Sequence, residues 1–471
     1  MWFAAVLALA AVALGTVALL TAPVPEVAGA PSRGSSSAVA TATPLLSARR
    51  APAWTARPVA ARNVANAATP ALGAFPPDAC VVVRDGPVTL VGLNGATPLV
   101  PASNMKVLTG AAALAILGPD TRLTTTFRAG APPVDGVVAG DLWMVGGGDP
   151  LLATGTYAST QSSPTPVTSL EAAADSLVSG GLRRVTGSVV GDESRYDTER
   201  TRPSWPARFV GDRQVANLSA LMVNDAWTVG ALEPGPDPGP APDPALYAAT
   251  ILTDLLRARG VVVDGPPAVG VAPPTSVVLG QATSAPVSDV VTELLTFSDN
   301  TTAELLVKEI GRVAGGAGTS DAGLTVMRRW LDEQGLPTAG VVLADGSGLS
   351  ADNRLTCDLL TALLVRSGPD GTLANGLARP GRPGTLSRRL REDDVRDRVR
   401  AKTGSLNSVR SLSGWITTVP GRPLAFAMLA NTGARIADES DEAVEEALLR
   451  TLLAYPQTPT PAELGPLPAG G

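Results

Sequence analysis

A helical pattern of apolar positions runs through residues 101–118 (PASNMKVLTGAAALAILG). Its apolar side chains recur every three or four residues, at Val107, Leu108, Ala111, Leu114, Ala115 and Leu117. The Gly-Pro pair that follows is typical of a helix end. The pattern therefore predicts one helix that carries Ser103 and Lys106 near its start. Because the two side chains are three residues apart, they share a face and can meet.

Shorter runs predict the other elements. Strands are expected at residues 80–84, 88–91, 123–128, 141–145, 184–190, 221–223, 261–263, 277–279, 341–343, 412–416 and 424–429. Helices are expected at residues 247–259, 287–295, 301–313, 322–333 and 443–453. The stretch 121–229 has short alternating runs and many glycines, which predicts one or two small, mostly β modules. Residues 233–244 form a linker of proline, glycine and aspartate.

The N-terminal region has a different character. Residues 2–22 are almost entirely apolar, and this length can span a bilayer. No lysine or arginine precedes them, so the basic start of a typical signal peptide is missing. We expect a signal peptide or a membrane anchor at residues 1–22. Residues 23–75 have little periodicity and predict a disordered tether, so ordered structure is expected to begin near Phe75.

Composition then restricts the chemistry. The 471 residues are enough for two or three domains, and they include no histidine. This excludes Ser-His-Asp and Cys-His catalysis and argues against most zinc sites. A net charge of −6 without a basic run argues against nucleic acid as a partner. Cys80 and Cys357 have no metal-binding spacing; they either form one disulfide or are two buried small side chains. We expect neither a cofactor nor a metal.

The lysines are unusually rare. The chain has three of them, Lys106, Lys308 and Lys402, against 34 arginines. Lysine can release a proton where arginine cannot, so these three are candidates for that work. A serine hydroxyl needs a neighbour that removes its proton, and without histidine this must be a lysine or a carboxylate. Lys106 could serve Ser103 if its pKa were lowered. The alternative is a plain helix start with a lysine that reaches solvent.

Two further motifs have both a structural and a functional interpretation. The sequence Ser298-Asp299-Asn300 precedes a predicted helix, and all three residue types are good N-caps. The sequence Lys402-Thr403-Gly404 precedes a predicted strand and could be a loop with an exposed lysine. Ser-x-x-Lys, Ser-Asp-Asn and Lys-Thr-Gly nevertheless occur in this order, and two of the three lysines fall within them. Together they match the signature of penicillin-interacting serine enzymes.

Spacing narrows the resemblance. The chain runs 192 residues from Lys106 to Ser298, which indicates an insert after the nucleophile helix. The arrangement resembles the D-alanyl-D-alanine carboxypeptidase/endopeptidase family, the class C low-molecular-weight penicillin-binding proteins. Three more segments are similar to that family: residues 140–150 (GDLWMVGGGDP), 187–196 (GSVVGDESRY) and 345–356 (DGSGLSADNRLT).

The resemblance implies a role for each motif residue. Ser103 would attack the carbonyl and form an acyl-enzyme, with Lys106 as its base. Ser298 would relay a proton to the leaving amine, and Asn300 would bind the substrate's peptide backbone. The third motif would bind substrate through Thr403, Gly404 and Ser405, with Lys402 holding a carboxylate and lowering the pKa of Lys106 by its charge. The N–H groups of Ser103 and Ser405 would form the oxyanion hole.

The resemblance also implies an α/β (α+β) fold. We expect a β-lactamase/transpeptidase-like domain, an antiparallel sheet flanked by helices, that is interrupted by the β-rich insert. The expected layout is a leader or anchor at 1–22, a tether at 23–75, the first part of the transpeptidase-like domain at 76–120, the insert at 121–244, the second part of that domain at 245–455 and a loose tail at 456–471. The implied substrate is the D-Ala-D-Ala stem peptide of peptidoglycan, or a D-Ala-diaminopimelate cross-link. The resemblance also implies that β-lactams acylate the enzyme and that it works outside the cytoplasm.

Two alternatives remain. A β-lactamase or esterase could use the same three motifs, but fast deacylation of β-lactams needs a dedicated water-activating group, which is often a carboxylate on a loop between the second and third motifs. Asp345 and Asp352 lie in that interval, although within the peptidase-like DGSGLS segment. A catalytically silent cell-wall binding protein would not need both motif lysines. Lys308 matches no motif and is expected on the surface of its helix.

Overall fold

The computed structural model describes residues 53–161, 165–230, 232, 238–460 and 463. The predicted signal peptide or anchor at residues 1–22 lies outside these residues. Among the helices of the described residues, none is both long and apolar enough to cross a bilayer.

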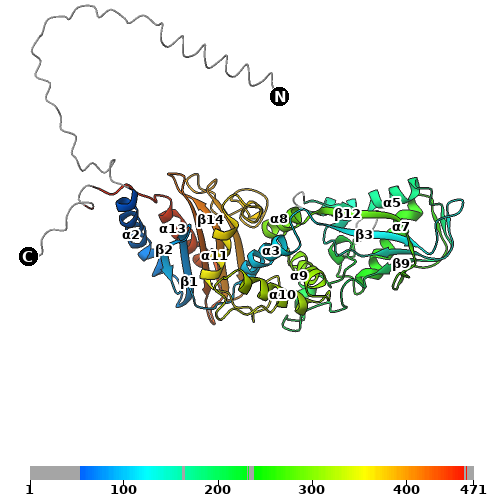
Figure 1. Cartoon of the computed structure of the whole chain (residues 1–471), viewed down its shortest axis with the longest axis horizontal. Helices are drawn as coiled ribbons and strands as arrows, with labels where there is room; N and C mark the ends of the chain where they lie inside the picture. Colours follow the sequence, from blue (N-terminus) through cyan, green and yellow to red (C-terminus); the bar gives the residue numbers. More distant parts are fainter. Residues whose placement is uncertain (1–52, 162–164, 231, 233–237, 461–462, 464–471) are drawn as a thin grey trace, which may run out of the picture. The chain divides into compact units, whose positions relative to one another are not determined.

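The elements follow the chain in this order (Figure 1). The helices are α2 (Ala53–Leu72), α3 (Met105–Ile116), α4 (Gly155–Thr160), α5 (Leu170–Ser179), α6 (Arg208–Gly211), α7 (Pro244–Ala258), α8 (Val287–Phe297), α9 (Asn300–Ala314), α10 (Ser320–Glu333), α11 (Cys357–Ser367), α12 (Thr372–Gly376) and α13 (Glu439–Leu452). The strands are β1 (Asp78–Asp85), β2 (Val88–Leu93), β3 (Arg122–Ala129), β4 (Val137–Val138), β5 (Leu142–Val145), β6 (Leu152–Ala153), β7 (Thr168–Ser169), β8 (Arg184–Val185), β9 (Val189–Asp192), β10 (Val262–Val263), β11 (Ala268–Val269), β12 (Val277–Pro286), β13 (Val399–Leu406), β14 (Val409–Thr417) and β15 (Pro423–Asn431).

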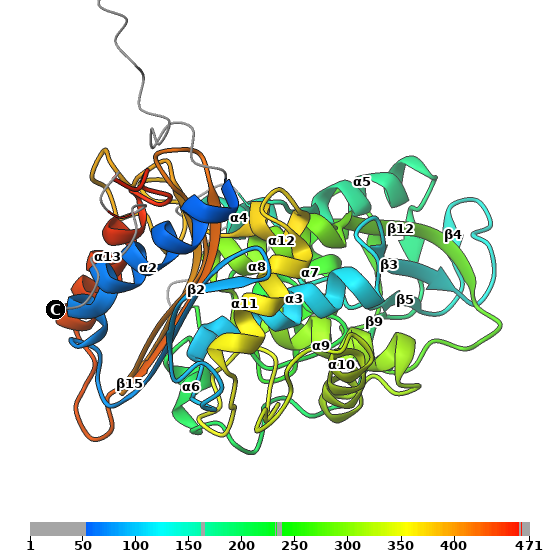
Figure 2. The same ribbon diagram turned by 60° about the vertical axis from the view of Figure 1, so that its left-hand side comes forward.

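A five-stranded antiparallel sheet joins both ends of the described chain in the order β13-β14-β15-β1-β2. Successive side chains of a strand point to opposite faces. On β1, Cys80 and Val82 accordingly pack in one core with α3, α8, α9 and α11, whereas Val81 and Val83 pack in a second core with α2 and α13. Helices therefore cover both faces of the sheet (Figure 2). This confirms the predicted fold class.

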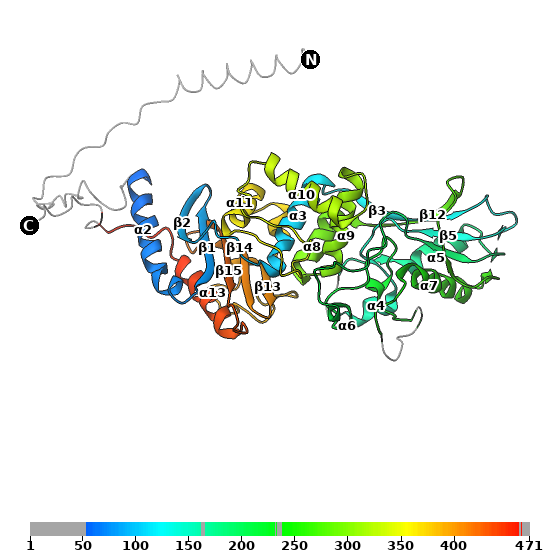
Figure 3. The ribbon, with the colours of Figure 1, turned by 90° about the horizontal axis from the view of Figure 1, so that it is seen from below.

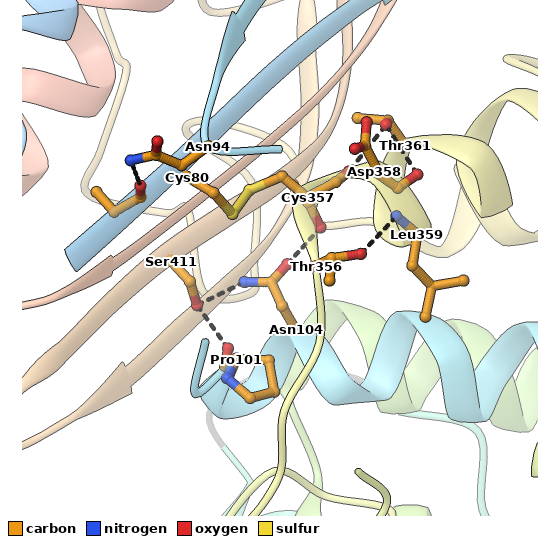
Figure 4. The surroundings of a disulfide bond; sticks show 12 residues. Cys80, Asn94, Pro101, Asn104, Thr356, Cys357, Asp358, Leu359, Thr361 and Ser411 are labelled. Atoms are coloured by element: carbon orange, nitrogen blue, oxygen red, sulfur yellow. Dashed lines mark hydrogen bonds between the residues drawn. A yellow bond between two sulfur atoms is a disulfide. The ribbon is translucent and has the colours of Figure 1, made fainter. Parts of the chain in front are cut away.

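The two cysteines form a disulfide, which decides between the alternatives that the sequence left open. Cys80 on β1 is bonded to Cys357 at the start of α11, across 277 residues of sequence (Figure 4). The bond ties α11 to the sheet. A structural disulfide is typical of proteins in oxidising compartments outside the cytoplasm.

The predicted tether is wrong for residues 53–72, because these form α2. Ala60, Val64 and Ala68, four residues apart, are buried against the sheet beside α13. Alanine is the best helix former, but it gives little contrast between apolar and polar positions. Two prolines within the segment, Pro58 and Pro70, weakened the helical pattern further.

The predicted end of the insert at residue 244 is also wrong. A second sheet has the order β11-β9-β5-β3-β12, so it includes strands that follow this boundary. Strand β12 pairs with β3, from Val277 opposite Ala129 to Pro286 opposite Arg122. Helices α5 and α7 share its core, so the insert contains helices as well as strands (Figures 1 and 3). Pairing between strands so distant in sequence leaves no local pattern.

Other predictions were confirmed or failed element by element. The predicted helices correspond to α7, α8, α9, α10 and α13, and α3 is the nucleophile helix. Residues 184–190 form two short strands instead of one, and 221–223 form none, although Leu221 and Val223 are buried. Residues 341–343 make only a single bridge, between Val342 and Arg354. Leu221 and Val223 are buried without a neighbouring strand, and Val342 is exposed, so a short apolar run does not require a strand.

Candidate active site

Ser103 lies at the entrance to α3. Residues 102–104 form a 3-10 turn that leads directly into this helix. Ala102 has a φ of +47°, a conformation that costs energy for a residue with a side chain. Gly348 packs against this turn so closely that a Cβ there would lie 1.9 Å from the Ala102 carbonyl oxygen. The close packing of Gly348 thus helps to hold the turn that contains Ser103 in a strained conformation.

Strand β14 fixes the same turn from the sheet side. Asn104 donates a hydrogen bond from Nδ2 to Ser411 Oγ (2.7 Å), and Ser411 donates to the Pro101 carbonyl (2.7 Å; Figure 4). Ser413 donates to Asn104 Oδ1. Ser411 and Ser413 are two residues apart and therefore share a face of β14. These three side chains and one backbone carbonyl join the turn of Ser103 to the sheet.

Lys106 is completely buried in the first turn of α3. Its Nζ donates to Ser103 Oγ (3.1 Å), Asn300 Oδ1 (2.6 Å) and the Ser347 carbonyl (2.6 Å). An ammonium has three protons to donate, so all of them are used. None of the acceptors is charged.

This environment changes the acidity of Lys106. Burial disfavours the charged ammonium and lowers the pKa of Lys106 from 10.5 to about 8. Nearby carboxylates oppose this effect and raise its pKa; in order of size they are those of Asp345, Asp299, Glu304 and Glu293. An amine with this pKa is partly uncharged near neutral pH, and only the uncharged form can accept a proton.

The Ser-Asp-Asn motif forms the junction between α8 and α9, which both pack against α3 (Figure 3). Asp299 is the N-cap of α9 and accepts a hydrogen bond from Thr302 N (2.7 Å). Ser298 has a φ of +66° and lines the cleft beside Asn300. Asn300 contacts Lys106 through Oδ1 and donates through Nδ2 to the Gln214 carbonyl of the insert (2.5 Å). The capping interpretation thus holds for the aspartate alone.

The Lys-Thr-Gly motif lies within the edge strand β13, not before a strand as expected. A Cβ on Gly404 would lie 2.2 Å from Ser411 Oγ and 3.0 Å from the Ser103 nitrogen. Only glycine lets this strand approach the nucleophile turn so closely. The backbone of the third motif therefore lies directly beside the backbone N–H of Ser103.

Lys402 is also fully buried, and its Nζ donates to the Thr403 carbonyl (2.8 Å). Burial first, and then the charge of Lys106, hold the pKa of Lys402 well below its usual value. We expected Lys402 to lower the pKa of Lys106. Burial is the largest cause of the lowered pKa of Lys106. Charge repulsion between the two lysines lowers the pKa of Lys402, and the role expected of Lys402 toward Lys106 stays a prediction.

The DGSGLS segment provides the Ser347 carbonyl that accepts a hydrogen bond from Lys106. Asp345 accepts hydrogen bonds from Trp205 Nε1 (2.8 Å), Gly348 N (2.8 Å), Ser350 N (2.6 Å) and Asn353 Nδ2 (2.6 Å). Glu304 on α9 accepts from Ser347 N (2.7 Å) and the neighbouring Gly346 N (2.9 Å). These bonds fix the carbonyl of Ser347, which Lys106 contacts. Sequence analysis missed Glu304, because its only signal was a charged residue within a predicted helix.

The structure has a cleft of about 770 Å³ beside the nucleophile turn. Its lining includes residues from all three motifs: Ser103, Ser298, Asn300, Thr403, Gly404 and Ser405. Its charged lining residues are two arginines, Arg208 and Arg410, and no carboxylate is among them. This is notable in a chain of net charge −6.

The expected surface position of Lys308 is wrong. Its side chain is fully buried and donates to Asp197 Oδ1 and to the Glu199 carbonyl (3.0 Å), both in the insert. On the next residue, Glu309 accepts from Arg195 Nε (2.8 Å) and from a tyrosine hydroxyl of the same insert segment. Helix α9 therefore carries one end of the Ser-Asp-Asn motif and also docks the insert.

Comparison with known proteins decides the family. The D-Ala-D-Ala carboxypeptidase 3 (S13) family matches residues 81–243 and 240–452. The chain belongs to this family. It is therefore a serine-type D-Ala-D-Ala peptidase, as the motifs predicted, and its place of action is outside the cytoplasm, at the cell wall.

Individual relatives agree with this assignment. The enzyme is 29% identical to a D-alanyl-D-alanine carboxypeptidase of Actinomadura over 417 residues, which covers 73% of this chain and 75% of the relative. It is 32% identical to a carboxypeptidase of Mycobacterium tuberculosis over 352 residues, covering 71% of each chain. The structure of penicillin binding protein 4 from Haemophilus influenzae superimposes with a TM-score of 0.68 at 21% identity, covering 83% of this chain and 98% of that one. The last comparison supports the fold alone.

Proposed function

We propose that the enzyme hydrolyses D-Ala-D-Ala stem peptides of peptidoglycan through an acyl-enzyme on Ser103. The observation that carries the proposal is the environment of Lys106. It is a buried amine with a pKa lowered to about 8, and it lies 3.1 Å from the serine oxygen without a carboxylate partner. This combination is what a lysine needs to act as a general base.

In the proposed acylation, the uncharged Lys106 takes the proton of Ser103, whose oxygen attacks the carbonyl carbon of the penultimate D-Ala. The N–H groups of Ser103 and Ser405 stabilise the oxyanion; the close approach at Gly404 supports this arrangement. The C–N bond then breaks, and the leaving amine takes a proton from the Lys106 ammonium through the Ser298 hydroxyl. In deacylation, water attacks the ester carbonyl, Lys106 takes the proton of this water, and Ser103 regains its proton as the ester bond breaks.

The remaining motif residues would hold the substrate. Asn300 already bridges Lys106 and the insert, so a peptide bound to its amide would be placed relative to the base. Thr403 lines the cleft on the strand that would run beside the peptide. Lys402, which is buried and lies on the same strand, would supply positive charge when a substrate carboxylate arrives.

The β-lactamase alternative has less support. Asp345 is fully buried, and its two oxygens accept four hydrogen bonds, so it has no free lone pair for a water. Asp352 is exposed and is not among the cleft-lining residues. We therefore expect β-lactams to act as inhibitors that acylate Ser103 and leave slowly.

The domain layout and the anchor are part of this proposal. A catalytic domain would consist of residues 53–120 and 287–455, interrupted by an insert at 121–286. A leader or single-span anchor at residues 1–22 would place the enzyme at the outer face of the membrane.

The test is intact-mass spectrometry of the full chain, in detergent, after incubation with benzylpenicillin, beside Ser103→Ala. We expect a stable single adduct on the parent alone, and release of D-Ala from diacetyl-L-Lys-D-Ala-D-Ala. Rapid loss of the drug without an adduct would indicate a β-lactamase. If neither an adduct nor turnover is observed, the protein would be a catalytically silent binding protein.

A further inference from the structure

A second cavity lies between the insert and the junction of α8 and α9. Its volume is about 190 Å³. Among the described residues, its lining and that of the catalytic cleft have no member in common. Much of its wall is apolar or aromatic, and these side chains are Leu151, Leu152, Ala153, Tyr157, Val167 and Phe297. A short alkyl chain in this cavity would be in contact with such side chains.

Three carboxyl groups from different elements converge on this cavity. Glu293 lies in α8, Asp299 is the N-cap of α9, and Asp225 lies in a turn of the insert. Burial, and then the charges of all three carboxylates, raise the pKa of Tyr157 on α4, so they lie close together around it. The described lining includes no lysine or arginine. The cavity therefore combines apolar walls with acidic groups that have no counter-ion in the lining.

Glu293 lacks a partner for one of its oxygens. Its side chain is buried, at 7% exposure, and Oε2 has no hydrogen-bond donor within the described chain. Burial, and then the charges of Asp299 and Asp225, raise the pKa of Glu293 well above its usual value. The charge of Lys106 opposes this effect, but Lys106 donates its three hydrogens elsewhere. A cation in the cavity would supply both the missing donor and the missing charge.

The turn that carries Asp225 has an unfavourable backbone conformation. Asn224, Asp225 and Ala226 have φ values of +56°, +54° and +51°, a left-handed conformation that costs energy in residues with a side chain. The buried Asn224 side chain holds this turn. Its Oδ1 accepts a hydrogen bond from Thr154 N (2.8 Å), and its Nδ2 donates to the Tyr247 hydroxyl (3.1 Å). Hydrogen bonds thus stabilise the conformation that places Asp225 at the cavity.

We propose that this cavity is a binding site for a small organic cation, a primary ammonium group on a short alkyl chain. An ammonium has three hydrogens to donate, and the three carboxyl groups can accept them. The alkyl chain packs against Leu152 and Phe297. In the described chain no cluster of acidic side chains has the arrangement to hold a metal ion, so an organic cation fits better than an inorganic one. The site goes beyond the proposed function and does not depend on it.

The test is an NMR titration of the full chain, in detergent, with n-butylammonium and separately with butan-1-ol. The two probes have the same length and differ in charge. At pH 8 we expect the alcohol to bind at least about tenfold more weakly, because it has no charge to pair with the carboxylates. Affinity for the ammonium should rise by up to about tenfold per pH unit from pH 6 to 8, because the carboxyl groups release protons when they pair with it. Equal binding of the two probes, or no binding of either, would overturn the inference.

Two substitutions locate the site. Glu293→Gln and Asp225→Asn keep the size of the side chain and remove its charge, so each should weaken ammonium binding about tenfold. Glu445→Gln is the matched control and should leave binding unchanged. Glu445 is also buried with one oxygen that lacks a hydrogen-bond partner, but it lies in α13 beside Arg389.

Circular dichroism and thermal unfolding show whether each variant is folded. Equal losses in all three variants, or no loss in either cavity variant, would mean that the ammonium binds elsewhere and would overturn the inference. If neither cavity variant folds, the comparison of the two probes and the pH dependence on the parent chain still decide.

Discussion

Two regions of this enzyme each bury a lysine completely, and they use it differently. Lys106, beside the nucleophile Ser103, contacts a hydroxyl, an amide oxygen and a carbonyl. Lys308, where α9 meets the insert, contacts the carboxylate of Asp197 and a carbonyl. Burial is the same, but only Lys308 has a charged partner in direct contact.

The difference shows what separates a base from a structural cation. Burial alone pushes an amine toward its uncharged form, whereas a carboxylate in contact stabilises the charged form. The carboxylates around Lys106 raise its pKa only from a distance, and burial outweighs them. A lysine that must release and regain a proton is therefore surrounded by neutral acceptors.

The same substitution at both lysines gives the largest contrast. Lys106→Met should reduce acylation by benzylpenicillin about 10³-fold, the usual scale of a general base. Its free energy of unfolding should change by less than about 2 kcal/mol, because lost hydrogen bonds are offset by relief of the cost of burying an amine. Stopped-flow acylation and denaturant unfolding measure the two quantities. Full acylation activity in this variant would refute its assignment as the base.

Lys308→Met should show the opposite. Removing one partner of a buried ion pair is strongly destabilising, but Asp197 is 33% exposed and can be rehydrated in part. We expect a loss of about 2–3 kcal/mol in unfolding free energy, with acylation per folded molecule within a few-fold of the parent. Adding Asp197→Asn should recover part of that stability. A loss of acylation without loss of stability would show that this region acts on the site directly.

The pH dependence of acylation gives a third test. Lys106 is active only when it is uncharged, so the rate should rise with pH through about 8 and level off above it. Rates measured with benzylpenicillin from pH 6 to 10 give the midpoint. A rate that is already level below pH 7 would contradict the lysine base.

Glu304→Gln should give the smallest effect. It removes a carboxyl group whose charged form raises the pKa of Lys106, but it keeps an oxygen for the N–H groups of Gly346 and Ser347. Burial raises the pKa of Glu304 itself to about 8, so this charge is only partly present at the midpoint and the effect is small. The midpoint should move to lower pH by a few tenths of a unit. Glu445→Gln is the control, because it is equally buried and lies in α13 beside Arg389. A similar shift in both variants would mean that the effect is not local to Lys106.

Local chemistry was readable in the sequence where it depends on short spacing. The three-residue separation of Ser103 and Lys106 places them in contact at any helix start, and the structure has this contact. The Ser-Asp-Asn and Lys-Thr-Gly motifs were identified by residue type and order. The residues that hold the motifs in place through hydrogen bonds, among them Asn104, Ser411 and Glu304, were missed. The type of a polar residue does not reveal which distant residue it will contact in the fold.

The sequence by itself determined the family, the fold class and the residues of the three motifs. These depend on residue identity and on helical or strand periodicity over a few positions. Only the tertiary structure decided that Cys80 bonds to Cys357, that β12 closes the insert's sheet against β3, and that Lys308 is buried. Each of these depends on contacts between segments that are distant in sequence, and such contacts leave no periodic pattern in either segment.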